Sequence, residues 1–166
     1  MNVIASAAVP EIDIEIASPL WAQQPQAEAT VRAAIAAAAQ LVPAAGEVSV
    51  LLAGDEAVRV LNRDWRGVDK STNVLSFPHQ SDQVPFTLLG DVAIAFETVA
   101  REAAIEHKPF LHHLAHLAVH GFLHLMGYDH ATDSEAETME GLERDILARL
   151  AIADPYAELH PEPGNA

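Results

Sequence analysis

The alternation of apolar and polar residues predicts four β-strands. Ile12, Ile14 and Ile16 alternate with acidic residues, which is the pattern of a strand with one buried face. Three further short runs, rich in branched and aromatic residues, predict strands over residues 48–52, 73–77 and 88–96. Polar stretches containing Gly or Pro separate them, and residues 66–72 and 79–87 are expected to be loops.

Apolar residues at helical spacing predict five helices between and after these strands. Asp55 is placed to cap the second helix. Pro109 suits the first turn of the fourth, and Thr132 and Glu135 have the T-x-x-E spacing of a capping box that opens the fifth. The helices are expected over residues 25–41, 55–64, 97–107, 109 to about 126, and 132–150.

The order of these elements predicts an α/β (α+β) fold. A strand followed by a helix and another strand favours parallel pairing, because the crossover helix returns the chain in the same direction. The fourth strand follows the third without a helix and is a candidate antiparallel edge strand. We therefore expect a small, mixed, mostly parallel four-stranded sheet packed by about five helices. Residues 1–153 are predicted to form one domain, and residues 154–166, with three prolines, a mobile tail.

Composition narrows the cellular setting. The chain has 166 residues, half of them apolar, and no cysteine, which fits a single globular domain in a reducing compartment. Acidic residues interrupt the apolar positions near the N-terminus, so we predict neither a signal peptide nor a membrane span, and a cytoplasmic location. The formal net charge of −15 by itself argues against binding nucleic acid.

Three histidines near the end of the fourth predicted helix are the strongest functional signal. His120 and His124 stand four residues apart, so they project from one helical face. Gly127 can end the helix in a left-handed conformation, and the turn can then bring His130 beside the other two. Three imidazoles that leave a fourth position open are the ligand set of a catalytic zinc site. The sequence therefore predicts one Zn²⁺ per chain.

The same spacing occurs in metzincin proteases, but one residue differs. Those enzymes carry a glutamate directly after the first histidine as general base, whereas this chain has Gly121 there. The histidine spacing thus favours a metalloprotease as an alternative, and Gly121 opposes it.

Other polar residues near this motif have open roles. His116 lies four residues before His120 and is a rival ligand, although a supporting or core position suits it better. Asp129 can orient a ligand imidazole or bind backbone. Asp91 lies in a predicted strand, where Asp is disfavoured, so it either approaches the metal as a catalytic residue or lies at a strand edge.

A cationic stripe is the second candidate feature. Arg59, Arg63 and Arg66 share one face of the second predicted helix, and Lys70 follows them. Such a stripe can recognise phosphate. It can equally be a solvated face whose arginines pair with Asp55, Glu56 and Asp64. Arg66 stands apart from the others because it opens a loop, where functional residues are common.

Three segments together resemble the YbeY family of bacterial rRNA-maturation endoribonucleases. They are residues 61–78, which include LNRDWRG and DKSTNVLSFP, then LGDVAI at residues 89–94, and residues 113–139 with the histidine motif. The resemblance covers residues 48–150 well. One departure is Ala131, because members of the family often have a glutamate after the third histidine.

The resemblance implies a function and a set of site residues. His120, His124 and His130 would bind zinc, and Arg66 would be the functional arginine near the substrate phosphate. The activity implied is single-strand-specific endoribonuclease cleavage in 16S rRNA 3′-end maturation and ribosome quality control, with precursor rRNA as substrate and a protein of the small ribosomal subunit as partner. A zinc-bearing ribosome-assembly factor without catalysis is a further alternative. The acidic total suggests that a partner delivers the RNA.

Overall fold

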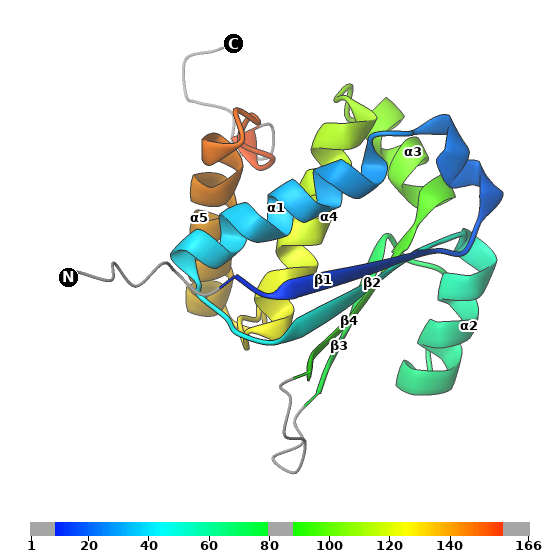
Figure 1. Cartoon of the computed structure of the whole chain (residues 1–166), viewed down its shortest axis with the longest axis horizontal. Helices are drawn as coiled ribbons and strands as arrows, with labels where there is room; N and C mark the ends of the chain where they lie inside the picture. The colour runs from blue at the N-terminus through cyan, green and yellow to red at the C-terminus, as the bar shows by residue number, and fades with distance from the viewer. Residues whose placement is uncertain (1–8, 80–87, 158–166) are drawn as a thin grey trace.

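The computed structural model describes residues 9–79 and 88–157, which form four strands, five α-helices and one short 3-10 helix (Figure 1). The predicted loop over residues 79–87 therefore lies, apart from His79, outside the described residues, as do residues 158–166 of the predicted tail. In chain order the elements are β1 (Glu11–Ile16), η1 (Pro19–Gln23), α1 (Ala27–Leu41), β2 (Glu47–Ala53), α2 (Asp55–Arg66), β3 (Val74–Pro78), β4 (Leu88–Ala95), α3 (Phe96–Ile105), α4 (Phe110–Leu125) and α5 (Asp133–Arg149).

The sheet is mixed and mostly parallel, as predicted, with the strand order β1-β2-β4-β3. β1, β2 and β4 run parallel, and β3 pairs antiparallel with β4. The expectation of β4 as the edge strand is wrong, because β3 occupies the edge and β4 lies inside the sheet. The physical reason is burial: Val92, Ala93 and Ile94 are all buried, so β4 needs cover on both faces.

Helices cover the two faces of the sheet unequally. α1, α4 and α5 form a layer on one face, where the main core gathers around Ile35, Phe122 and Ile146 (Figure 1). On the other face α2 packs over a small cluster that includes Val58 and Leu75. Beside α2, residues of β2, β3 and β4 line a cleft on this face.

The helix ends follow local chemistry, with one correction. Thr132 caps α5 as predicted, since its Oγ1 accepts the Glu135 N–H at 3.1 Å. Asp55, however, does not cap its own helix, whose N-cap is Gly54. Its carboxylate instead accepts hydrogen bonds from the backbone N–H and hydroxyl of Thr98 at the start of α3, at 3.2 and 2.7 Å. No helix in the described part of the chain has the length and apolar character needed to cross a membrane.

Gly121 allows α4 to lie very close to the sheet. A Cβ at this position would meet Val92 Cγ1 at 2.8 Å and Ser76 Oγ at 3.2 Å. Ser76 also donates a hydrogen bond to the Gly121 carbonyl at 3.1 Å. The position where a metzincin carries its glutamate is therefore filled by the neighbouring strands, and a side chain there has no room.

Replacing Gly121 with alanine is expected to lower the free energy of unfolding by about 1–3 kcal/mol, the usual cost of forcing extra volume into a packed core. Urea denaturation measures this change. Gly141→Ala is the matched control, because Gly141 lies in α5 with open space around its Cα, and alanine in a helix is favoured over glycine by up to about 1 kcal/mol. Equal stability of Gly121→Ala and wild type would contradict the close packing.

Candidate metal centre

Three histidines from α4 and the following turn converge at one point. His120 and His124 lie one turn apart on α4, and Gly127, with φ +95°, reverses the chain as predicted. His130 then returns, with its ring 5.7 Å from that of His120 and 5.1 Å from that of His124, between ring centroids. Each ring offers one nitrogen, and the three nitrogens lie within 4.8 Å of one another. The structure thus brings together the predicted ligand set.

The spacing of the two nitrogens on α4 fits a tetrahedral metal ion. The Nε2 atoms of His120 and His124 are 3.1 Å apart. Two ligands bound at about 2.05 Å in tetrahedral geometry would be roughly 3.3 Å apart. The cluster is also asymmetric in its exposure, since His120 and His124 are partly buried and His130 is exposed. A cation held here would keep one side open to solvent, as a catalytic site requires.

Glu143 of α5 supports this cluster from behind. Its side chain is buried, and its Oε2 lies 3.1 Å from His120 Nδ1. Its other oxygen, Oε1, accepts hydrogen bonds from His116 Nε2 at 2.5 Å and from the Tyr156 hydroxyl at 2.6 Å. Burial alone would raise the pKa of this carboxyl, but the hydrogen bonds from His116 and His120 lower it to about 2. Glu143 is therefore an ionised carboxylate in the protein interior.

A buried charge of this kind gives a second reason to expect a cation. A carboxylate out of water is costly unless it is paired. In the part of the chain that the structure describes, the ionic partners of Glu143 are His116 and His120, and no Lys or Arg pairs with it. A positive ion bound to His120 Nε2 would compensate the negative charge of Glu143 through the imidazole ring that lies between them. A carboxylate placed behind a ligand histidine in this way is common at metal sites.

Glu143 was not among the site residues predicted from the sequence, although the sequence contained a signal for it. Apolar residues recur at helical spacing along α5, and Glu143 falls among them, four residues after Met139 and three before Ile146. These apolar residues are Ala136, Met139, Leu142, Ile146 and Leu150. An acidic residue on a buried helical face needs a specific partner. That requirement could have pointed to the histidines.

His116 is placed as a support for the ligands. Its side chain is 12% exposed, and its Nε2 is directed at Glu143. His116, His120 and Glu143 also lie close enough to form a rival ligand group. Two facts favour the predicted trio: the His116 nitrogen that faces the group is already hydrogen-bonded to a carboxylate, and His130 stands next to both His120 and His124.

His124 has an environment that suits a ligand. Burial lowers the pKa of its imidazole, and the neighbouring His120 and His130 lower it further. A lowered pKa keeps the ring neutral, and the neutral ring is the form that binds metal.

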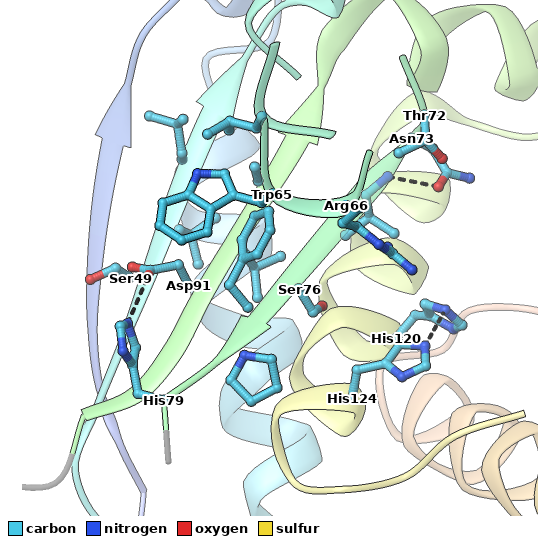
Figure 2. A pocket seen from close by; sticks show the side chains of 18 of the residues that line it. Ser49, Trp65, Arg66, Thr72, Asn73, Ser76, His79, Asp91, His120 and His124 are labelled. Atoms are coloured by element: carbon cyan, nitrogen blue, oxygen red, sulfur yellow. Dashed lines mark hydrogen bonds and ion pairs between the residues drawn. The ribbon is translucent and has the colours of Figure 1, made fainter. Parts of the chain in front are cut away.

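Asp129 and Asp91 lie in well-defined places. Asp129 Oδ1 accepts the backbone N–H of His130 at 2.7 Å, so it holds the turn that carries this ligand. Asp91 lies on β4 and accepts a hydrogen bond from His79 Nε2 at 2.7 Å. Figure 2 shows Asp91 and His79 on the side of the cleft away from His120 and His124. Asp91 therefore lies on the sheet, and a catalytic role for it stays a prediction.

A cleft joins the histidines to the open face of the sheet. It has a volume of about 1370 Å³, above the roughly 300–1000 Å³ typical of small-ligand pockets, and so it has room for a polymer. It is lined by Trp65 and Arg66 of α2 and by residues of β2, β3 and β4, and it reaches His120, His124 and His130. Figure 2 shows Arg66 at the end of α2 with its side chain directed toward the histidine pair.

The predicted cationic stripe is mostly neutralised. Arg59 pairs with Glu56 and Asp69, and Arg63 pairs with Asp64. Within the described ranges Arg66 has no acidic partner at ion-pair distance. Gly67 ends α2 with φ +72°, in the left-handed conformation that favours glycine, which leaves Arg66 as the last helical residue at the cleft. The structure thus separates Arg66 from the arginines that form a solvated, paired face.

Fold and site together define an α/β protein with a three-histidine candidate metal centre beside an open cleft. The chain matches the family model described as Endoribonuclease YbeY over residues 14–151. It therefore belongs to the YbeY endoribonuclease family, as the sequence resemblance implied.

Individual relatives agree with this assignment. The chain is 52% identical over 160 residues to the endoribonuclease YbeY of Bradyrhizobium sp. strain BTAi1, covering 90% of this chain and 94% of the relative. It is 54% identical over 158 residues to that of Rhodopseudomonas palustris strain BisA53, covering 90% and 91%. The solution structure of TM1509 from Thermotoga maritima shares the fold, with a TM-score of 0.54 at 21% identity, covering 93% of this chain and 99% of that one.

Proposed function

We propose that this protein is a zinc-dependent endoribonuclease that cleaves single-stranded RNA. Its membership of the YbeY family supports the reaction class. The observation that carries the proposal is the convergence of His120, His124 and His130 at the wall of a cleft that Arg66 also lines. We further propose that the substrate is precursor rRNA, that the step is 16S 3′-end maturation together with ribosome quality control, and that the protein works in the cytoplasm.

Each group of residues has a distinct part in this reaction. The three imidazoles would hold the metal, which supplies Lewis-acid chemistry at the scissile phosphodiester. The Arg66 guanidinium would bind two phosphate oxygens through its planar fork and stabilise the charge that develops on them. Either water or the RNA 2′-hydroxyl is the attacking group, and a cyclic phosphate on the products would identify the hydroxyl.

Binding of free RNA is expected to be weak, with a shallow dependence on salt. The net charge of −15 repels a polyanion, and Arg59 and Arg63 are already paired with acids. We expect about 2–4 phosphate contacts, each contributing about 0.7 to the slope of log affinity against log salt for single strands. Fluorescence anisotropy of a labelled RNA over a salt series measures this slope, and tight, steeply salt-dependent binding would contradict it.

The same charge balance supports a protein partner. A small-subunit ribosomal protein bound to this chain would supply local concentration and register that the acidic surface cannot. Cleavage of one rRNA precursor should therefore be faster and more selective within pre-ribosomal particles than in free RNA.

The metalloprotease alternative loses support from Gly121. The family of proteases with this histidine spacing needs a glutamate at that position, and the contacts of Gly121 with β3 and β4 leave no space for one. Incubating the zinc-loaded protein with a peptide library, with single-stranded RNA and with the matching duplex tests the proposal. Cleavage of the single strand alone is expected. Cleavage of peptides would favour the protease, and no cleavage of either would favour a non-catalytic assembly factor.

A further inference from the structure

Glu143 collects three hydrogen-bond donors from two separate parts of the chain. Two of them are His116 and His120, one turn apart on α4. The third is the Tyr156 hydroxyl, which comes from the turn that follows α5 and lies 13 residues further along the chain. The Tyr156 ring also packs edge-on against the His116 ring, with centroids 5.5 Å apart. The segment after α5 is thus joined to the histidine cluster through one buried carboxylate.

The turn that carries Tyr156 has its own anchors. The Asp154 carboxylate accepts the backbone N–H of Tyr156 at 2.8 Å and lies 3.9 Å from the Arg144 guanidinium. Residues 154–157, which the sequence predicts as the start of a mobile tail, therefore include a side chain that is fixed on the core of the protein.

The chemistry of a carboxylate decides where the proton of His120 lies. The Tyr156 hydroxyl donates to Glu143 Oε1, and Glu143 Oε2 lies 3.1 Å from His120 Nδ1. A carboxylate oxygen accepts hydrogen bonds, so Nδ1 carries the hydrogen of this contact. In a neutral imidazole the other nitrogen, Nε2, then has a free lone pair. Nε2 is the nitrogen that lies 3.1 Å from His124 Nε2, inside the candidate metal centre.

We propose that Glu143 and Tyr156 are positioning residues of the metal centre: Glu143 fixes the His120 imidazole in the tautomer that presents Nε2 to the metal, and Tyr156, with His116, holds the Glu143 carboxylate in place. The proposal rests on the proposed function and extends it to the C-terminal segment. On this proposal the turn after α5 supports the metal site through Tyr156, which is not itself a metal ligand.

The zinc affinity of Glu143→Gln tests whether Glu143 fixes the His120 tautomer. If the Gln carbonyl oxygen keeps the two donors on its side, His116 and Tyr156, its NH₂ group faces His120 Nδ1 and donates to it. This favours the opposite tautomer, with hydrogen on Nε2, which cannot bind metal. Competition with a chromophoric chelator should show zinc affinity reduced about 10–100-fold, the usual range for removing such a partner. Glu137→Gln, an exposed carboxylate on the same helix, should leave the affinity unchanged.

Tyr156→Phe tests whether Tyr156 holds the Glu143 carboxylate. It is a milder change than Glu143→Gln, so it keeps the proposal testable if Glu143→Gln misfolds. It removes one hydrogen bond and keeps the ring that packs on His116. We expect zinc affinity about tenfold weaker, at the lower end of such effects. Affinity equal to wild type in both variants would overturn the proposal. Complete loss of zinc in Glu143→Gln, combined with normal zinc binding in His130→Ala, would also overturn it, because Glu143 would then be a ligand.

The tautomer itself can be observed without metal. Long-range ¹H–¹⁵N correlation spectra of the metal-free protein should show hydrogen on Nδ1 of His120 in wild type, and on Nε2 in Glu143→Gln. The same tautomer in both proteins would overturn the positioning role. This measurement also separates the two claims, because a wild-type protein with the expected tautomer but no affinity for zinc would refute the metal centre while keeping the Glu143–His120 contact.

Discussion

Replacing His124 with alanine is expected to remove most of the bound zinc and to abolish RNA cleavage. His124 is one of only three proposed ligands, and losing it leaves two imidazoles, which is fewer than either structural or catalytic zinc sites use. Since changes to residues that merely support a ligand cost about 10–100-fold in affinity, loss of a ligand should cost more than about 100-fold.

Elemental analysis of purified protein measures this effect directly. Wild type should hold about one zinc per chain, and His124→Ala far less. His112→Ala is the matched control, because it removes a partly buried histidine from the same helix but outside the cluster. Equal zinc in wild type and His124→Ala would remove the proposed centre. Circular dichroism should show the same helical content in all three proteins, since α4 and its packing on the sheet are otherwise intact.

Replacing Arg66 with glutamate is expected to abolish cleavage while the fold and the zinc content stay unchanged. Arg66 is exposed at the end of α2, lines the cleft and points toward the histidine pair (Figure 2). Removal of one preorganised donor to a transition-state oxyanion costs about 10²–10³ in turnover, and reversing the charge should cost at least as much. Arg66→Lys keeps the charge but loses the bidentate fork, so its cleavage rate should lie between those of wild type and Arg66→Glu.

Arg63→Glu separates a specific role from a general loss of positive charge. Arg63 lies on the same helix, but it pairs with Asp64 and is not part of the cleft wall. Steady-state cleavage of a single-stranded RNA should therefore fall strongly in Arg66→Glu and little in Arg63→Glu. Cleavage by Arg66→Glu at the wild-type rate would refute the phosphate role, and unfolding of this variant would make Arg66 a structural residue.

The histidine cluster and the cap of α5 could be predicted from the sequence, because both depend on residues that are close along the chain. The helix repeat and Gly127 were enough to place His120, His124 and His130 together, because their geometry is set within about ten residues of chain. The Thr132 capping box was predictable for the same reason. Family resemblance, rather than periodicity, supplied the function and the role of Arg66.

Features that depend on tertiary contacts were missed. Asp55 accepts hydrogen bonds from Thr98 in the first turn of α3 instead of capping its own helix, because Thr98 lies next to it in space, 43 residues away in sequence. The position of β3 at the sheet edge follows from β4 being buried on both faces, which a count of crossover helices does not reveal. Glu143 and Tyr156 reach His120 only after α5 packs on α4, so no short-range motif joins these three residues.

Digestion of one precursor rRNA with and without a chelator tests whether metal held by the three histidines drives RNA cleavage. We expect wild type to cleave the precursor, to stop after chelation and removal of the chelator–metal complex, and to recover when one equivalent of zinc is added back. His124→Ala should be inactive throughout. Cleavage that survives complete removal of metal, or equal cleavage by His124→Ala, would show that the reaction does not depend on metal bound by these histidines.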